Sequence, residues 1–484
     1  MFSMDRRDFL KSMAASAAMA AVGGMNLHAA VPEGKKPLLR FGAVSDVHIY
    51  LDPKCTDTWE KTLKWYDEQK VDAVLVAGDI ADWGLVQQLQ NFSNIWDKVF
   101  PNDKSTLDGR HVEKIFVCGN HDIVGWTYGA RTKEDRDARY EKSINKDPKA
   151  AWDLCFHEEF KGIYTKVVKG YTFIGGHWGW DKGIEQYMEE NKSKIDPNLP
   201  FFYTQHPHPK DTVYGPWAWG HDNGFSTRTF SKFPNSIVLT GHSHYPLTDE
   251  SGIWQDTFTS IGTASLRYVG TRYGRENSDE VCRPTEPDLQ MRAIGGGNSR
   301  QGMLFSIYDD QITIGKRDFS CDKTLGEDWV LPLPLCKEKP YYHPKRKLEY
   351  AKNLPAFAAD AAAQIAVTEA VGKNRRGADV PQVTVTFPAA LSGGQTFDYE
   401  VQAELTFYDV TRVFGTMRVF ADNYYRAWDM QEKTVKCVFT QAELPKKVGL
   451  RFAITPMDAF GNRGKTIYSK TMKLGEAPAP QPAK

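Results

Sequence analysis

Apolar and polar residues alternate along the chain in two different patterns, and the first of them predicts strands and helices in turn. Three short apolar runs bounded by polar residues, as expected of buried strands, lie at residues 38–45, 71–77 and 112–118. Between these runs, apolar residues recur at the spacing that places them on one face of a helix. The two helical faces consist of Trp59, Leu63 and Tyr66, and of Leu85, Leu89, Phe92, Trp96 and Val99. This order of elements predicts the beginning of an α/β domain.

Further apolar runs at residues 171–174, 201–204 and 236–240 continue the pattern, and periodicity alone adds them to the same doubly wound sheet. The connections between these runs are long and rich in glycine, proline and tryptophan. Long connections often carry binding residues, so we treat them as candidates for substrate contacts.

The pattern changes after residues 332–352, a stretch rich in proline and lysine. Beyond it, apolar residues occupy every second position of the segments 383–387, 397–405 and 450–454, as in half-buried antiparallel strands. Such strands without a helical face predict a small all-β sandwich. Within it, the segment 452–462 resembles the late-strand and turn region of fibronectin type III modules.

The amino terminus has the pattern of an export signal. Residues 6–11 read Arg-Arg-Asp-Phe-Leu-Lys and precede a weakly apolar run that ends in Ala29 and Ala30. This resembles a twin-arginine signal, whose cargo is exported already folded, and an ordinary basic signal is the alternative. No Cys follows the run as a lipid anchor requires, the next being Cys55, and no other apolar stretch is long enough to span a bilayer. We therefore expect a bacterial periplasmic or secreted protein that uses the twin-arginine export machinery and has no stable membrane anchor.

The length of 484 residues exceeds that of one ordinary domain. We expect a signal peptide at 1–30, an α/β domain at 31–340, a linker at 341–354, a β-sandwich at 355–475 and a disordered Pro/Ala tail at 476–484.

Charge and cysteine content exclude several classes of partner. Lys and Arg together number 61, as do Asp and Glu, so the neutral chain offers no overall positive surface for nucleic acid or an anionic membrane. The 13 Trp, 21 Tyr and 26 Phe leave rings available for a binding surface. The seven Cys include no C-x-x-C pair, which argues against a zinc ribbon or a redox dithiol, and pairing of Cys321 with Cys336 stays open.

Five apolar runs end in residues with metal-ligand chemistry. The endings are Asp46-Val47-His48, Gly78-Asp79, Gly119-Asn120-His121-Asp122, His206-Pro207-His208 and Gly241-His242-Ser243-His244. In an open α/β sheet the carboxyl ends of the strands face one crevice, so we expect these segments to converge. Gly119-Asn120-His121-Asp122 is rare by chance, whereas each of the other endings is common by itself. Burying so many carboxylates and imidazoles together is costly unless cations satisfy them.

Two cations with nitrogen and oxygen ligands and one shared carboxylate suit this set. Such a pair acidifies a bridging water, giving a hydroxide aimed in line at phosphorus, and neutralises charge on the phosphoryl oxygens. The order of the motifs across residues 38–268 resembles that of the calcineurin-like metallophosphoesterases. The resemblance implies two mixed β-sheets flanked by helices in place of a single sheet, and it makes 31–340 the catalytic domain.

The resemblance also implies roles for individual residues. One metal is expected on Asp46, His48, Asp79 and His244, and the other on Asp79, Asn120, His206 and His242, with Asp79 bridging. The ions are expected to be divalent or trivalent, namely Mn, Fe, Zn or Co. His121 is expected outside this set, where it stabilises the transition state or protonates the leaving oxygen, and Asp122 is expected to orient its imidazole.

Three positions near the motifs require a choice. Either His206 or His208 reaches the second metal, and we favour His206 because it follows the apolar run most directly. His177 also ends an apolar run, and there we favour a core or substrate-loop histidine over a ligand. The residue three positions after the bridging aspartate is Asp82 where purple acid phosphatases have tyrosine, which argues against a tyrosinate-bound iron.

Aromatic residues and arginines near the motifs are candidates for substrate contacts. The rings are Trp126, Tyr128, Trp178, Trp180, Tyr214, Trp217 and Trp219. Packing of the loops is an equally good explanation for any one of them. For Arg267 and Arg272, a solvated surface position is favoured over a phosphate clamp.

The function expected from these observations is a secreted or periplasmic dinuclear metallophosphoesterase that hydrolyses a phosphomonoester or phosphodiester of a small molecule. The alternative is an envelope binding or docking protein that uses the carboxyl-terminal β-sandwich and keeps a degenerate phosphoesterase scaffold. The intact ligand set argues against that alternative. A nuclease is disfavoured because the chain is neutral.

Overall fold

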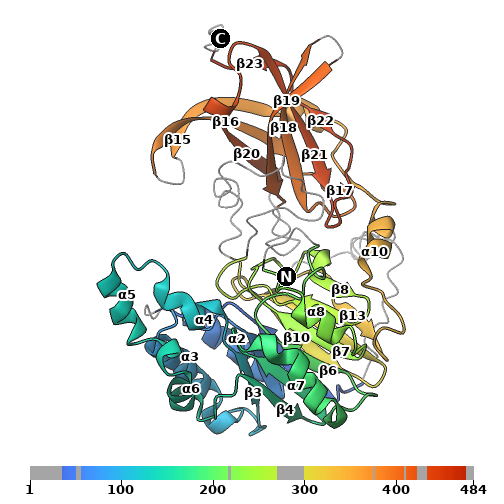
Figure 1. Cartoon of the computed structure of the whole chain (residues 1–484). Coiled ribbons are helices and arrows are strands. Elements are labelled where there is room, and N and C mark those ends of the chain that lie inside the picture. The colour runs from blue at the N-terminus through green and yellow to red at the C-terminus, as the bar shows by residue number, and fades with distance from the viewer. Residues whose placement is uncertain are drawn as a thin grey trace, which may run out of the picture. The chain divides into compact units, whose positions relative to one another are not determined.

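The computed structural model describes residues 35–50, 56–215, 220–269, 299–373, 377–407, 410–421 and 433–475 (Figure 1). These residues divide into an amino-terminal unit, which runs to His343 and also includes residues 420–421, and a carboxyl-terminal unit made of Pro344–Val419 and the residues from Lys433 on. The predicted signal at 1–30 and tail at 476–484 lie outside the described residues. The stretch predicted to be a linker, 341–354, includes helix α10, His343–Tyr350.

The amino-terminal unit contains two mixed β-sheets, which confirms the fold implied by the resemblance. The first has the order β12-β11-β10-β1-β2-β3, with β13 paired to β11, and the second the order β4-β5-β6-β7-β9-β8. Strands of the first sheet are β1 (Leu39–Val44), β2 (Ala73–Ala77), β3 (Glu113–Val117), β10 (Gln301–Ile307), β11 (Gln311–Asp318), β12 (Lys323–Thr324) and β13 (Trp329–Pro332). Strands of the second are β4 (Ile163–Val168), β5 (Tyr171–Gly176), β6 (Phe201–Thr204), β7 (Ser236–Thr240), β8 (Ile253–Gln255) and β9 (Thr259–Gly262). The prediction from periodicity of one continuous sheet is therefore wrong, because the runs from residue 171 onward pair among themselves.

Aromatic rings hold the two sheets together. Phe41 of β1 stacks on Phe305 of its own sheet at 4.5 Å between ring centroids. The same ring meets Phe173 of β5 at 5.2 Å and Phe202 of β6 at 4.8 Å, both in the second sheet. All four rings are fully buried, so the core between the sheets is built largely on Phe41.

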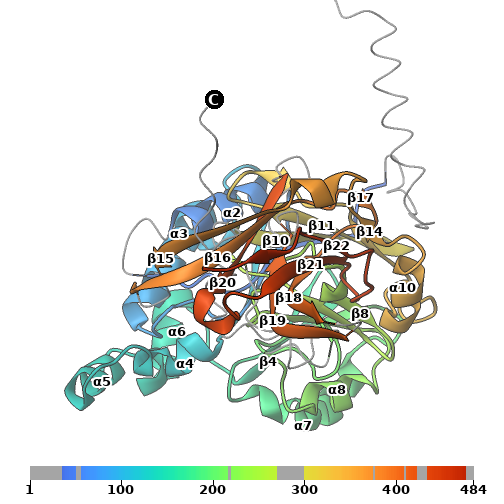
Figure 2. The ribbon, with the colours of Figure 1, turned by 90° about the horizontal axis from the view of Figure 1, so that it is seen from above.

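Helices cover both sheets, and the two predicted helical faces are buried, except that Leu85 lies just before its helix. Their bounds are α2 (Asp57–Glu68), α3 (Val86–Val99), α4 (Asn120–Val124), α5 (Lys133–Tyr140), α6 (Pro148–Phe156), α7 (Ile184–Asn191) and α8 (Phe225–Phe230). Trp59 of α2 stacks on Phe92 of α3 at 4.5 Å, and Phe92 meets Phe116 of β3 at 5.4 Å, so these helices pack on the first sheet. Helices α7 and α8 lie side by side (Figures 1 and 2). Their residues Ile184, Met188 and Phe230 share a buried cluster with Phe201 and Tyr203 of β6 in the second sheet.

The turns that follow the parallel strands lie next to one another. Strands β1, β2 and β3 run parallel, as do β5, β6, β7 and β9. The amide of Asp46 donates to the Gly78 carbonyl at 2.9 Å, and the amide of Gly241 donates to the His206 carbonyl at 3.0 Å. Parallel strands therefore bring the carboxyl ends of both sheets, and the predicted ligand segments, to one edge.

The carboxyl-terminal unit is built mainly of β-strands, as predicted. One sheet has the order β15-β16-β20, another the order β19-β18-β21-β22 with β23 paired to β21, and β14 pairs with β17. Their bounds are β14 (Pro355–Ala356), β15 (Ala366–Lys373), β16 (Asp379–Pro388), β17 (Ser392–Gly393), β18 (Asp398–Phe407), β19 (Val410–Phe420), β20 (Thr434–Thr440), β21 (Gly449–Met457), β22 (Ile467–Tyr468) and β23 (Met472–Lys473). Phe387 meets Tyr399 at 5.1 Å and Phe439 meets Phe452 at 5.4 Å, so the two larger sheets face each other across a core.

We predict that Phe41→Ala lowers the free energy of unfolding of the amino-terminal unit by about 3–5 kcal/mol, because it leaves a cavity between two sheets that meet through this ring. Chemical denaturation followed by tryptophan fluorescence measures the change. Val167→Ala in β4, at a position 64% exposed, is the matched control and is expected to cost less than about 0.5 kcal/mol. Equal stability of the two variants would contradict this account of the core.

Candidate metal centre

Both sheets supply side chains to one cluster of carboxylates and imidazoles. Asp46 and His48 follow β1, Asp79 follows β2, and Asn120 begins α4 directly after β3. The second sheet contributes histidines after β6 and β7, namely His206, His242 and His244. The amide of His242 donates to Asp46 Oδ2 at 3.0 Å, which links the turn after β7 to the turn after β1. The cluster therefore exists only when the two sheets are packed.

The backbone at this cluster is held in a conformation that costs free energy. Asp46, His48, Asp79, His242 and His244 all have positive φ angles between 48° and 72°. Left-handed backbone at a residue other than glycine costs on the order of 1 kcal/mol, and it persists where the surroundings enforce it. Such conformations concentrate at functional sites, and here they turn five candidate ligands toward one point.

Three glycines in the motifs are required by close contacts. A Cβ atom on Gly78 would collide with the ring of His206, and one on Gly119 would collide with the Asp79 carboxylate. A Cβ on Gly241 would likewise overlap Asp46 Oδ2. The glycine that precedes each of these ligand segments is thus explained by the space that the neighbouring ligand occupies.

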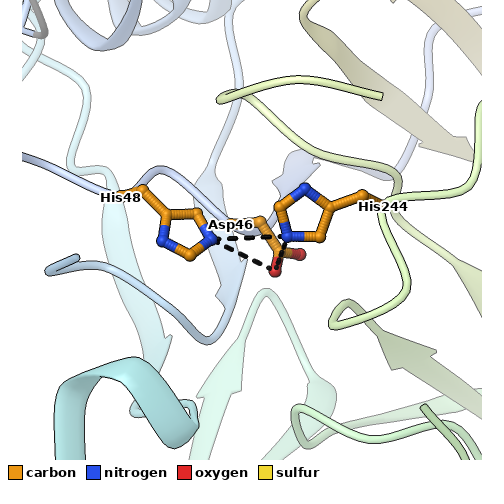
Figure 3. A group of neighbouring side chains, drawn as sticks. All are labelled: Asp46, His48 and His244. Atoms are coloured by element: carbon orange, nitrogen blue, oxygen red, sulfur yellow. Dashed lines mark hydrogen bonds and ion pairs between the residues drawn. The ribbon is translucent and has the colours of Figure 1, made fainter. Parts of the chain in front are cut away.

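The first group of candidate ligands consists of Asp46, His48 and His244, whose side chains point toward one another (Figure 3). His244 Nε2 lies 3.0 Å from Asp46 Oδ1, and His48 Nε2 lies 3.4 Å from His244 Nε2 and 3.7 Å from Asp46 Oδ1. One carboxylate oxygen and two imidazole nitrogens at this spacing suit a divalent cation.

The second group consists of Asp79, His206 and His242. His206 Nε2 lies 3.0 Å from Asp79 Oδ2 and 3.1 Å from His242 Nδ1. Asp79 Oδ2 is also 3.7 Å from His48 Nε2 of the first group. Asp79 therefore stands between the two groups, where a shared carboxylate belongs in a dinuclear centre.

Hydrogen bonds to the outer ring nitrogens fix how three of these histidines face the centre. His206 Nδ1 donates to the Ala77 carbonyl at 2.8 Å, and His244 Nδ1 donates to the Tyr268 carbonyl at 3.0 Å. His48 Nδ1 contacts Asp82 Oδ1 at 3.0 Å. Each ring is thereby left with Nε2 turned inward, as metal-ligating histidines commonly are.

Two buried oxygens in the cluster lack a hydrogen-bond partner. Asn120 donates from Nδ2 to the Tyr128 hydroxyl at 3.1 Å, while its Oδ1 is buried without any hydrogen bond. Asp46 Oδ1 is also buried without one. Leaving such oxygens unsatisfied is costly, and coordination of a cation removes the cost, so the residues present fit a metal centre.

The electrostatics of the cluster favour positive charge at its centre. Burial disfavours a charged imidazole, yet the hydrogen bonds and charges of Asp46, Asp79 and Asp82 raise the pKa of His48 to about 10. The charges of Asp79 and Asp46 likewise overcome burial and raise the pKa of His206 to about 9. Burial lowers the pKa of His242 to about 3, which keeps that ring neutral. The field that draws protons here would equally hold divalent cations, which displace those protons.

Of the three histidines that required a choice, namely His177, His206 and His208, only His206 turns a ring nitrogen toward the centre. Both ring nitrogens of His208 are engaged away from the centre, Nδ1 with Thr240 Oγ1 at 2.6 Å and Nε2 with Ser243 Oγ at 2.7 Å. The geometry therefore supports His206 as the ligand. His177 accepts the Cys118 amide at 2.9 Å through Nδ1 and packs between Trp152 and Phe160, so it is a core histidine.

His121 lies beside the centre, but Asp122 does not orient it. A ring nitrogen of His121 falls within one ligand group with His48 and Asp79, and His121 Nδ1 donates to the Asp82 carbonyl at 2.6 Å. The Asp122 carboxylate instead accepts backbone amides, those of Gly119 at 2.7 Å, Ala81 at 2.6 Å and Ile80 at 3.1 Å. The expected role of Asp122 is thus corrected: it joins the start of α4 to the turn after β2. Consecutive helical residues point about 100° apart, which separates its side chain from that of His121.

Sequence reasoning missed the role of Asp82. This residue contacts His48 through its carboxylate and His121 through its carbonyl, so it positions two rings at once. The available signal was its place three residues after Asp79, in the same turn. Ser45 was also missed and belongs to no motif; its hydroxyl oxygen lies 2.5 Å from Asp46 Oδ2 and 2.8 Å from the Ala264 carbonyl, within hydrogen-bonding distance of both.

The cluster opens into a cavity of about 600 Å³. Among the rings predicted to lie near the site, Tyr128 lines the cavity, whereas Trp126 packs on Tyr140 and Tyr214 is buried against Tyr245. The ring centroids of Trp178 and His242 lie 5.6 Å apart. Trp180 is 40% exposed. Trp217, Trp219 and Arg272 lie outside the described residues. Arg267 is half-buried and lines the cavity.

Comparisons with known proteins agree with this geometry. Residues 39–246 match the family model of calcineurin-like phosphoesterases, and residues 3–23 match that of the twin-arginine translocation (TAT) pathway signal sequence. No curated protein matches the chain. The signal places the protein in the periplasm or outside the cell, as predicted, and each described helix is too short or too polar to cross a membrane.

Several solved structures match part of the chain. A dimetal phosphatase from Danio rerio is 13% identical, with a TM-score of 0.33, and the match covers 61% of this chain and 99% of that one. A predicted phosphoesterase from Streptococcus pneumoniae is 13% identical, with a TM-score of 0.26 and coverage of 61% and 97%. Vps29 from Entamoeba histolytica, complexed with Zn²⁺, is 10% identical, with a TM-score of 0.26 and coverage of 61% and 99%.

We predict that Asp82→Ala weakens metal binding about 10- to 100-fold, because His48 loses the carboxylate that holds its ring toward the centre. Metal titration of the apoprotein with Mn²⁺ or Zn²⁺ gives the dissociation constants. Asp97→Ala, on the exposed side of α3, removes the same charge away from the centre and should leave them unchanged. Wild-type affinity in Asp82→Ala would show that this contact does not support the ligand.

Proposed function

Residues 39–246 form a calcineurin-like phosphoesterase domain, and from this premise we propose that the exported protein hydrolyses a phosphomonoester or phosphodiester of a small molecule at a centre of two divalent cations. The observation that carries the proposal is the position of Asp79 between two groups of inward-facing ligands. A protein that only binds a partner has no need to keep both groups complete, so the intact set favours hydrolysis over docking.

The residues divide between two ion positions. Asp46, His48 and His244 would hold one ion and Asn120, His206 and His242 the other, with Asp79 shared. Bound there, the pair would acidify a water molecule and neutralise charge on the phosphoryl oxygens. The chain itself contributes fixed ligand geometry, enforced by the left-handed turns and by the packing of both sheets.

His121 is proposed to act on the leaving group. It lines the cavity, and its Nδ1–H is committed to the Asp82 carbonyl, so Nε2 is the nitrogen that meets a substrate. Burial lowers the pKa of His121, which makes its protonated form a stronger proton donor to the departing oxygen. The ring is thus suited to assist bond cleavage without holding a metal.

We predict that purified, metal-loaded protein hydrolyses 4-nitrophenyl phosphate or bis(4-nitrophenyl) phosphate, and that Asp79→Asn abolishes this activity and lowers the bound metal, because one shared ligand serves both ions. Release of 4-nitrophenol and elemental analysis of the same samples measure the two effects. Asp153→Asn, exposed on α6, is the control and should behave as wild type. Full turnover by Asp79→Asn, or no turnover by wild type with Mn, Fe, Co and Zn, would contradict the proposal.

We predict that His121→Ala retains its metal but loses about 10²- to 10⁴-fold in kcat, since it removes the proposed proton donor and leaves the ligands in place. Steady-state kinetics combined with metal analysis separates the two properties. His111→Ala, 58% exposed and outside the cluster, tests the loss of an imidazole elsewhere in the fold. Loss of metal in His121→Ala would assign the ring to the ligand set instead.

A further inference from the structure

The cavity has lining residues that the metal chemistry does not use. One set, the candidate ligands and His121, faces the ions. The other set contains rings and guanidinium groups, namely Tyr50, Trp83, Tyr128, Arg139, Arg267 and Tyr268. A phosphoester whose phosphoryl group lies at the metals places its leaving group in the remaining space, among this second set.

Two arginines of this second set are held on aromatic faces. The guanidinium carbon of Arg267 lies 4.4 Å from the centre of the Tyr50 ring, and that of Arg139 lies 4.8 Å from the centre of the Trp83 ring. The two rings meet edge to face at 5.7 Å. Arg267, Tyr50, Trp83 and Arg139 therefore form a continuous row of contacts along the cavity, with each arginine over one ring and the two rings edge to face. Stacking fixes the plane of a guanidinium, which carries five N–H donors in a rigid fork.

Arg139 retains hydrogen-bonding capacity in this arrangement. Its Nε pairs with Asp135 at 3.0 Å and its Nη1 donates to the Tyr128 carbonyl at 2.9 Å, and within the described part of the chain Nη2 has no hydrogen-bond partner. The pair with Asp135 is on the surface, where such pairs contribute little. The side chain is thus oriented by the protein and still able to donate.

The charge of the cavity is also suited to an anionic leaving group. Its lining carboxylates are Asp79 and Asp82. Asp79 is paired with His206, and Asp82 with His48. Arg139 and Arg267 bring two guanidinium groups to the same lining. Because cations at the ligand groups would neutralise the phosphoryl group, the arginines provide positive charge for a different part of the substrate.

We propose that Arg139 and Arg267 form a subsite for a second anionic group, so that the substrate is a phosphoester whose leaving group carries a phosphate, phosphonate or carboxylate. The proposal rests on the proposed phosphoesterase function and specifies its substrate class. It differs from a clamp on the scissile phosphoryl group, which would serve substrates with and without a second anion equally.

The test compares two phosphomonoesters with the same carbon skeleton, 3-phosphoglycerate and glycerol 3-phosphate, which differ by a carboxylate in place of a hydroxymethyl group. Wild type is expected to favour 3-phosphoglycerate in kcat/KM. Arg139→Gln and Arg267→Gln are each expected to reduce that preference about 10- to 100-fold, the loss of one charge-assisted hydrogen bond. Both compounds are measured on one sample, so a loss of folded protein cancels in the ratio.

Arg136→Gln is the matched control, because Arg136 is exposed on the same helix, α5, and does not line the cavity. Its ratio of kcat/KM for 3-phosphoglycerate to that for glycerol 3-phosphate should equal the ratio of wild type. If neither compound is hydrolysed, the proposed function is contradicted for these esters, and the ratio of dissociation constants from calorimetry still tests the subsite. Equal preference for the two compounds in wild type, or an unchanged ratio in both cavity variants, would overturn the subsite.

Discussion

Burial of two carboxylates at one point, Asp46 and Asp79, is the constraint on which the amino-terminal unit depends. Both are almost fully removed from solvent, and each carboxylate is surrounded by imidazoles. Charges in such a position are tolerated only when opposite charge or coordination compensates them. The strained turns, the obligatory glycines and the inward-facing Nε2 atoms all follow from bringing compensating groups to these two carboxylates.

The same constraint connects the metal centre to the export route. Ligands come from turns that follow strands of two different sheets, and the sheets meet through a buried aromatic core around Phe41. An unfolded chain therefore has no such centre, and metal binding is coupled to folding. A twin-arginine signal, whose cargo crosses the membrane folded, is the route that allows a centre of this kind to be assembled before export.

Local patterns were sufficient to predict most of the elements and the candidate ligands. The apolar runs that precede Asp46, Asp79 and His242 are strands, as a short apolar run between polar turns predicts. Periodicity does not determine which sheet a strand joins, so the second sheet followed only from the resemblance. Nor does adjacency in sequence determine contact: Asp122 is next to His121, but Asp82 holds its ring. Arg139 approaches the cavity from a helix with no motif, and only the fold reveals it.

The central claim is that the chain holds two ions that share Asp79. Crystals of protein loaded with Mn²⁺ or Zn²⁺, measured by anomalous X-ray scattering at the metal edge, test it most directly. Two anomalous peaks per chain are expected, about 3.5–4 Å apart, one beside Asp46, His48 and His244 and the other beside His206 and His242. A single peak, or two peaks that do not both contact Asp79, would contradict it.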